Sequence, residues 1–128
     1  MKRKIILFFF FLIISPSLAL AEDEWWGKDW TNKDTAREVV YSALHIADWG
    51  QTRYIAKNPQ KFYERNPLLG KHPSVGKVDT YFFGGLVAHA AISYILPPKY
   101  RWVWQYVGIG MEGGAVAHNA SIGIKFEF

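Results

Sequence analysis

The residues best suited to chemistry form a polar stripe within residues 34–57. Successive members lie three or four positions apart, which places them on one face of a helix; they are Glu38, Tyr41, His45, Asp48 and Thr52. The carboxylate of Asp48 can orient the imidazole of His45, or both side chains can face a metal ion. The stripe therefore predicts a proton relay or half of a metal site or, on a helix exposed to water, an ordinary polar face.

Further polar residues interrupt the two later apolar segments. His89 lies in 75–96, and Glu112 and Asn119 lie one heptad apart in 100–120. If the helices pack together, we expect these side chains to meet the first stripe in one buried polar seam. The candidate residues are His45, Asp48, Gln51, Thr52, Glu64, Asn66, His89, Glu112 and Asn119, with His45, Asp48 and His89 as weak candidates for metal ligands.

No recognised catalytic or cofactor motif accompanies these residues. The chain has no His-Glu-x-x-His, no EF-hand loop and no Gly-x-Ser-x-Gly. The glycine-rich stretch 108–114 lacks the Lys-Ser/Thr ending of a phosphate-binding loop. The sequence therefore indicates no catalytic residue and no cofactor, and we expect a protein that is not an enzyme.

The N-terminal residues 1–21 have the pattern of a secretory signal peptide. Three basic residues precede a dense apolar run, and an Ala-x-Ala site ends at Ala21. Cleavage there lowers the formal net charge from +4 to +1, because the segment holds three basic residues and no acidic one. The basic balance is then no argument for nucleic-acid binding. The chain has no cysteine, so neither disulfides nor thiolate metal sites are available.

Helical spacing and turn residues divide the remaining chain. After an acidic, tryptophan-rich segment at 22–33, apolar residues follow helical spacing over 34–57, and the segments 75–96 and 100–120 are long apolar runs. A proline-containing basic loop over 59–77 joins the first two. We expect all-α architecture, a small three-helix membrane bundle over 34–124 followed by a tail at 125–128.

Three features favour a membrane location for this bundle. The two later segments have the length that a bilayer span requires, and the loop 59–77 is basic, as the positive-inside rule predicts for a cytoplasmic loop. Gly110, Gly114 and Ala117 fit small-residue patterns that bring membrane helices together. We therefore expect membrane lipid as a partner, a homo-oligomer through these three residues, and an exported protein of the inner membrane, with the outer membrane or periplasm as alternatives.

The C-terminus carries a competing signal. Residues 121–128 alternate strictly between apolar and other residues and end in Phe128, which is strand periodicity. Such an ending is typical of outer-membrane β-barrels, so the alternative fold is a small β-rich outer-membrane protein. A mixed or soluble helical fold is the remaining alternative.

Two short motifs carry a resemblance. Asp48-Trp49-Gly50-Gln51-Thr52 and Glu64-Arg65-Asn66-Pro67-Leu68-Leu69-Gly70, followed by an apolar helix with a histidine, resemble small uncharacterised exported membrane proteins of Proteobacteria and their phages. The resemblance covers about residues 31–124 and implies a helical membrane fold without implying an activity.

Together these observations predict a non-enzymatic integral membrane protein of the cell envelope, with a phage-related origin as one option and no indicated role. Two alternatives follow from the polar seam and from the tail. The first is a metal- or proton-binding membrane protein, and the second is an outer-membrane protein with a C-terminal β-signal.

Overall fold

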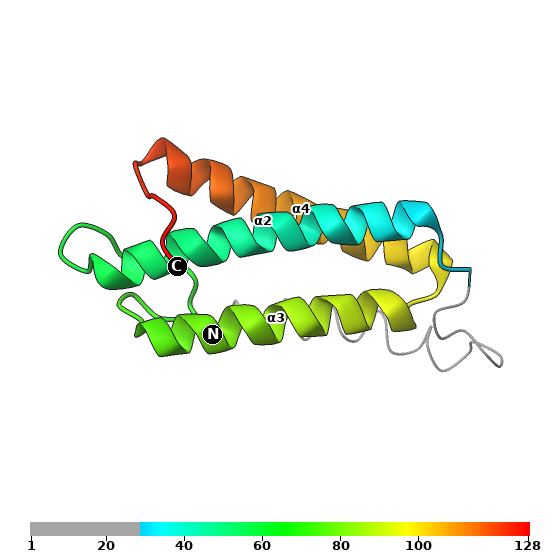
Figure 1. The fold of residues 1–128 in the computed structure, drawn as a ribbon, viewed down its shortest axis with the longest axis horizontal. Coiled ribbons are helices and arrows are strands. Elements are labelled where there is room, and N and C mark those ends of the chain that lie inside the picture. The colour runs from blue at the N-terminus through cyan, green and yellow to red at the C-terminus, as the bar shows by residue number, and fades with distance from the viewer. Residues whose placement is uncertain (1–28) are drawn as a thin grey trace.

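A computed structural model describes residues 29–128 as three long helices (Figure 1). They are α2 (Asn32–Lys57), α3 (Val75–Ile95) and α4 (Pro98–Ser121). The chain runs along α2, returns along α3 and runs forward again in α4 (Figure 1). The all-α, three-helix prediction is confirmed for these residues, whereas the expected signal peptide at 1–21 and most of the segment 22–33 lie outside them.

Local sequence signals set the starts of the helices. Thr31 caps α2 in a capping box, in which its hydroxyl accepts from the Asp34 amide and the Asp34 carboxylate accepts from the Thr31 amide. Ser74 caps α3 in the simpler way, by accepting from the Lys77 amide. α4 starts with Pro98 at its first position, where a missing N–H costs nothing.

A small apolar core lies where the loop between α2 and α3 meets the bundle. Leu69, Val78 and Phe82 are buried together, with Trp49 and Tyr81 packed against them. The loop reaches this core through a turn at Asn66, whose carbonyl accepts from the amides of Leu69 and Gly70. Gly70 adopts a positive φ of 80°, which glycine tolerates without a steric penalty.

Elsewhere the interior is polar and much of the outer surface is apolar. Fully buried side chains include Gln51, Arg101 and Gln105, while Met111 is 72% exposed and Phe83 is 61% exposed. Buried polar groups are tolerated only when they are hydrogen-bonded, because each unsatisfied group costs about 1–3 kcal/mol. Hydrogen bonds and ion pairs between helices therefore hold this bundle together to an unusual degree.

The expectation of a C-terminal strand is wrong for the described residues, because they contain no strand. The tail after α4 instead folds back onto α2 (Figure 1), where the Glu127 amide donates to the Gly50 carbonyl oxygen over 3.0 Å. The Phe128 ring packs edge-on against Trp49. The alternating pattern of residues 121–128 predicts a strand only where a neighbouring strand is available for pairing, so the pattern alone was misleading.

The prediction of an integral membrane protein is also wrong. None of the three described helices combines the length and the apolar character needed to cross a membrane. Charged residues interrupt two of the helices, since α2 contains Arg37, Glu38 and Asp48 and α4 contains Arg101 and Glu112, whereas α3 carries Lys77 and Asp79 only near its start. The expected transmembrane helix is therefore not found among the described residues, and the two membrane-based alternative functions gain no support.

Candidate functional site

Polar side chains fill the space between the helices in two clusters. The Glu38 cluster lies toward the start of α2 and comprises Asp34, Arg37, Glu38, His89, Ser93, Arg101 and Gln105. The Glu112 cluster lies toward the end of α2 and comprises His45, Asp48, Gln51, Glu112 and Asn119. Tyr41 connects them, because its ring stacks on His89 at a centroid distance of 3.4 Å and its hydroxyl lies 3.3 Å from His45 Nδ1.

The Glu38 carboxylate is saturated with hydrogen bonds, whereas Nε2 of His89 in the same cluster is buried and has no hydrogen-bond partner among the described residues. The Glu38 carboxylate pairs with His89 Nδ1 over 2.8 Å and accepts from the hydroxyl of Ser93 over 2.7 Å and the amide of Gln105 over 3.1 Å. Burial alone raises the pKa of Glu38, but these hydrogen bonds outweigh it and hold the pKa below its ordinary value. This carboxylate is therefore ionised and fixed in place.

Asp34 anchors the outer end of the same cluster. Its carboxylate forms ion pairs with Arg37 and with the fully buried Arg101. Burial opposes ionisation, whereas hydrogen bonds from Thr31 and Arg37 favour it, and the net result is a pKa of Asp34 below its ordinary value. Both guanidinium groups contact Asp34, and the cluster as a whole holds two carboxylates and two guanidinium groups. These contacts join all three helices and leave this end of the interior filled.

His45, in the Glu112 cluster, has an acceptor at each ring nitrogen. Nδ1 lies 2.8 Å from Oε1 of Glu112, and Nε2 lies 2.8 Å from the carbonyl oxygen of Phe82. A carbonyl oxygen cannot donate, so Nε2 must carry a proton, and the Glu112 carboxylate favours a proton on Nδ1 as well. Burial lowers the pKa of His45, but the bonds to Glu112 and Phe82 outweigh it and raise the pKa above its usual value. These contacts therefore favour the imidazolium form of the ring, whose charge balances a Glu112 carboxylate.

Asp48 lies beside Glu112 and differs from every other carboxyl of the interior. Burial and the neighbouring carboxylates of Glu112 and Glu64 raise the pKa of Asp48 to about 7, against a smaller opposing effect of His45. Asn119 donates to Oδ1 of Asp48 over 3.0 Å. A hydrogen bond between the Asp48 and Glu112 carboxyl groups contributes to the raised pKa of Asp48, and a proton held on Asp48 is its donor; we call this the shared proton. The second oxygen of Glu112, Oε2, is buried and accepts no other hydrogen bond from the described residues.

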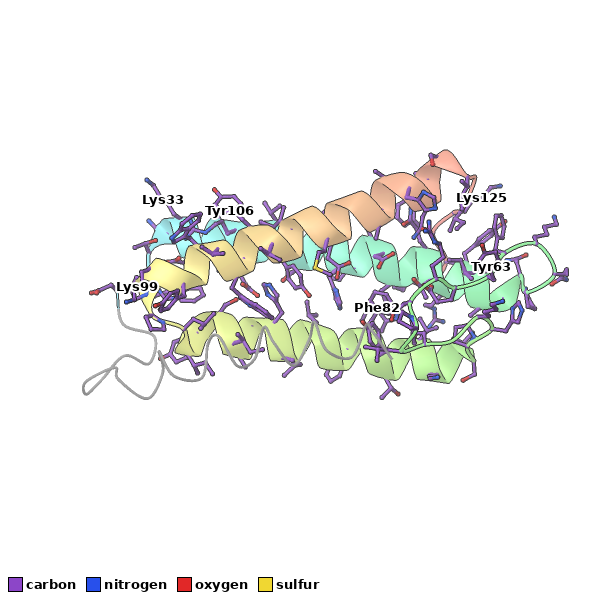
Figure 2. The ribbon with its side chains drawn as sticks, turned by 180° about the vertical axis from the view of Figure 1, so that it is seen from behind. Lys33, Tyr63, Phe82, Lys99, Tyr106 and Lys125 are labelled. Atoms are coloured by element: carbon purple, nitrogen blue, oxygen red, sulfur yellow. The ribbon has the colours of Figure 1, made fainter. Side chains whose placement is uncertain are left out.

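The shared proton lies at the wall of a cavity of about 500 Å³. The cavity opens between α2, α4 and the loop after α2, and Figure 2 places two of its lining residues, Tyr63 of the loop and Phe82 of α3, at this end of the bundle. Its polar lining comprises Asp48, Tyr63, Glu64, Arg65, Asn66, Tyr81, Glu112, His118 and Asn119, and its apolar lining comprises Ile55, Phe82, Met111, Ala115, Ile122 and Ile124. Both size and mixed lining are typical of small-molecule sites.

Glu64 and Asn66 shape the mouth of this cavity. The Glu64 carboxylate accepts from the Asn66 amide over 2.7 Å, and the Asn66 side-chain amide donates to the Tyr81 hydroxyl over 2.9 Å. Arg65 donates to His118 Nε2 over 3.1 Å, which ties the loop to α4. The loop is thus attached to both α3 and α4 by side chains that line the cavity.

The structure brings together most, but not all, of the residues singled out from the sequence. His45, Asp48, Glu112 and Asn119 meet in one cluster, with Gln51 between Asn119 and the Val116 carbonyl. Thr52 is buried on the same helix. His89 does not join them, because it pairs with Glu38.

The three metal candidates are consequently divided between the two clusters. Within residues 29–128, no three His, Asp or Glu side chains are placed to hold a metal ion.

Sequence reasoning missed Arg101, Gln105 and Tyr81. Arg101 and Gln105 lie four residues apart on α4, so their shared helix face was a signal that the sequence contained. Tyr81 had no such signal, because only the folded loop brings Asn66 to it.

Comparisons with protein-family models, with curated proteins and with solved structures find no match to this chain, so the geometry of its own residues carries the functional argument.

Proposed function

We propose that this protein is a non-enzymatic binding protein that holds a small organic molecule in the cavity between α2, α4 and the loop after α2. The observation that carries the proposal is the cavity itself, about 500 Å³ in volume, with a half-buried carboxyl pair at its wall. The contrast with the Glu38 carboxylate supports it, because both oxygens of Glu38 already have internal partners, whereas Oε2 of Glu112 has none apart from Asp48 among the described residues.

The lining is suited to recognition. Aliphatic side chains such as Ile55 and Ile124 form an apolar wall, while Asp48 and Glu112 provide oriented oxygen atoms on another side. Binding sites for small molecules combine a mostly apolar lining with a few fixed polar groups that orient the ligand. The hydrogen bonds that fix Glu112 to His45 and Asp48 to Asn119 preorganise those groups.

Saturation-transfer NMR tests this proposal with three probes of similar shape and different charge. They are 2-phenylethylammonium, 2-phenylethanol and 3-phenylpropanoate. At least one probe should give a transfer signal with the wild-type protein, and Ala115→Phe, which places a ring in the cavity, should abolish it. Ala90→Phe, on the exposed surface of α3, is the matched control. Absence of a signal from all three probes would refute the binding function.

Two expectations from the sequence remain proposals beside this function. The signal-peptide pattern supports an exported protein, which N-terminal sequencing of the mature chain tests. Gly110 supports a homo-oligomer, because a Cβ at this position would meet no atom of the described residues within 4 Å, whereas Gly114 lines the cavity.

A further inference from the structure

We propose that the ligand is a small organic cation, an ammonium group on an apolar body, and that it binds in exchange for the proton shared by Asp48 and Glu112. The inference rests on the proposed binding function and specifies its ligand class. It follows from three features of the cavity: the charge balance of its walls, the position of the shared proton, and the surroundings of Asp48.

The walls of the empty cavity are close to electrically neutral. Glu112 is balanced by the imidazolium of His45, which lies 2.8 Å away. At the mouth of the cavity, the carboxylate of Glu64 and the guanidinium of Arg65 contribute opposite charges. Asp48 contributes no charge while it holds a proton. A cation that entered without any other change would add an uncompensated charge to a partly buried site, which is costly.

Release of one proton removes this cost. An ammonium group that approaches Asp48 favours its carboxylate form, so the proton leaves for solvent and the new carboxylate pairs with the ammonium. Charge and atoms balance: the site gains one ammonium and loses one proton, and no covalent bond other than the O–H bond of Asp48 breaks. The displaced proton need not be replaced at Glu112, because the ammonium carries three donors of its own.

Charged and titratable groups approach Asp48 from every element packed around it. Glu112 faces it from α4, Glu64 from the loop and Tyr81 from α3, and His45 lies one turn earlier on α2. His45 is the one cation of this set, and its charge is already satisfied by Glu112 and the Phe82 carbonyl. At the wall formed by Asp48 and Glu112, an anionic ligand would therefore face carboxyl groups, whereas a cation finds a new partner; Arg65 lies at the mouth, where it donates to His118.

The remaining residues of the cavity lining determine which kind of group, attached to the ammonium, fits the site. Phe82, Met111, Ile122 and Ile124 offer aromatic and aliphatic surface, which an inorganic cation cannot use. Burial of apolar surface stabilises a complex by about 25 cal/mol per Å². An ammonium group attached to an apolar body satisfies both parts of the site.

Isothermal titration of the full chain with 2-phenylethylammonium tests the exchange. Titrations at about pH 6.5 in phosphate and in ACES, buffers of different ionisation enthalpy, measure the protons released. Wild-type protein should release roughly three-quarters of a proton per bound cation, because a group with a pKa of about 7 is protonated to that extent at this pH. Its apparent affinity should weaken on the order of tenfold per pH unit as the pH falls well below the pKa of Asp48.

Asp48→Asn and a matched control complete the experiment. Asp48→Asn keeps the shape of the protonated side chain, so it should fold, bind the cation at least tenfold more weakly and release no proton. Asp79→Asn removes a carboxylate that lies outside the cavity and pairs with Arg53, so it should behave like wild type. Circular dichroism confirms the fold of each variant.

The outcomes separate this inference from the function on which it rests. Cation binding without proton release, or equal binding of 2-phenylethanol or 3-phenylpropanoate, would overturn the exchange while leaving a binding protein. Failure of all three probes to bind would overturn the binding function itself.

Discussion

His45 and Glu112 lie 2.8 Å apart, and their contact joins the middle of α2 to the middle of α4. The opposite nitrogen of His45 reaches the Phe82 carbonyl of α3, so one imidazolium ties the three helices together. The same contact fixes one oxygen of Glu112 and leaves the other to Asp48, which lines the cavity. The stability of the bundle and the chemistry of the cavity therefore depend on one ion pair.

Replacement of Glu112 by glutamine should destabilise the protein. His45 would lose its charged partner, so its pKa should fall, and the free energy of unfolding should decrease by about 1–3 kcal/mol. Urea denaturation measures the stability, and NMR titration of the imidazole measures the pKa. Glu127→Gln is the control, because the Lys57–Glu127 pair is more exposed and contributes less than about 1 kcal/mol. Equal losses in the two variants would contradict a structural role of the His45–Glu112 pair.

Asp48 should make the protein less stable as the pH rises. Its pKa is about 7 in the folded chain and near 3.8 when unperturbed, so between these values the folded state holds a proton that the unfolded state has released. Stability due to this group is therefore greatest at low pH and is lost as the pH rises toward 7. Asp48→Asn should remove this loss and be the more stable protein at about pH 8, by at least about 1 kcal/mol. Urea denaturation at about pH 5 and pH 8 compares the two, and parallel pH profiles would count against a raised pKa.

Gly108 should be intolerant of even one methyl group. A Cβ there would lie 2.7 Å from His89 Nε2 and 2.9 Å from the Tyr41 ring. Since both rings are buried and stacked, Gly108→Ala should lower the melting temperature. Gly110→Ala, two residues along α4, meets nothing within 4 Å and should stabilise the helix by roughly 0.5–1 kcal/mol. Equal melting temperatures of Gly108→Ala and wild type would contradict this prediction, because they would show that the stacked rings move aside at little cost.

The proposed homo-oligomer makes a separate prediction. Gly110 is exposed and leaves open space beside α4, so Gly110→Leu should weaken an assembly that packs on this face. Light scattering after size exclusion should then show a smaller particle than for wild type. Asp79→Asn serves as the control here too, because Asp79 lies on α3. An unchanged particle mass would argue against this face as the interface.

The helices were predictable because their boundaries are local. Thr31 and Ser74 are good N-caps, and the pair Pro97-Pro98 ends one helix and starts another. Each signal acts within a few residues, so the sequence contains it directly. The meeting of His45 with Glu112 was predictable for a related reason, because polar residues on apolar helices must face one another to be satisfied.

The features that were not predicted correctly depend on how the helices and the tail are aligned with one another in the folded protein. His89 and Asp48 were expected in one seam, but the antiparallel run of α3 places His89 beside Glu38, nearer the start of α2. The tail was misleading because alternation does not supply a pairing partner, and the Glu127 amide instead binds the Gly50 carbonyl. The membrane prediction failed because apolar length was given more weight than the charges that interrupt α2 and α4.

The most direct test of the account is the ionisation of Asp48 itself. Carbon-13 NMR of the side-chain carboxyl, followed against pH with and without 2-phenylethylammonium, reports the proton at the wall of the cavity. The account predicts a midpoint near 7 in the free protein and a lower midpoint when the cation is bound. A midpoint near the ordinary value of an aspartate, unchanged by the cation, would contradict it.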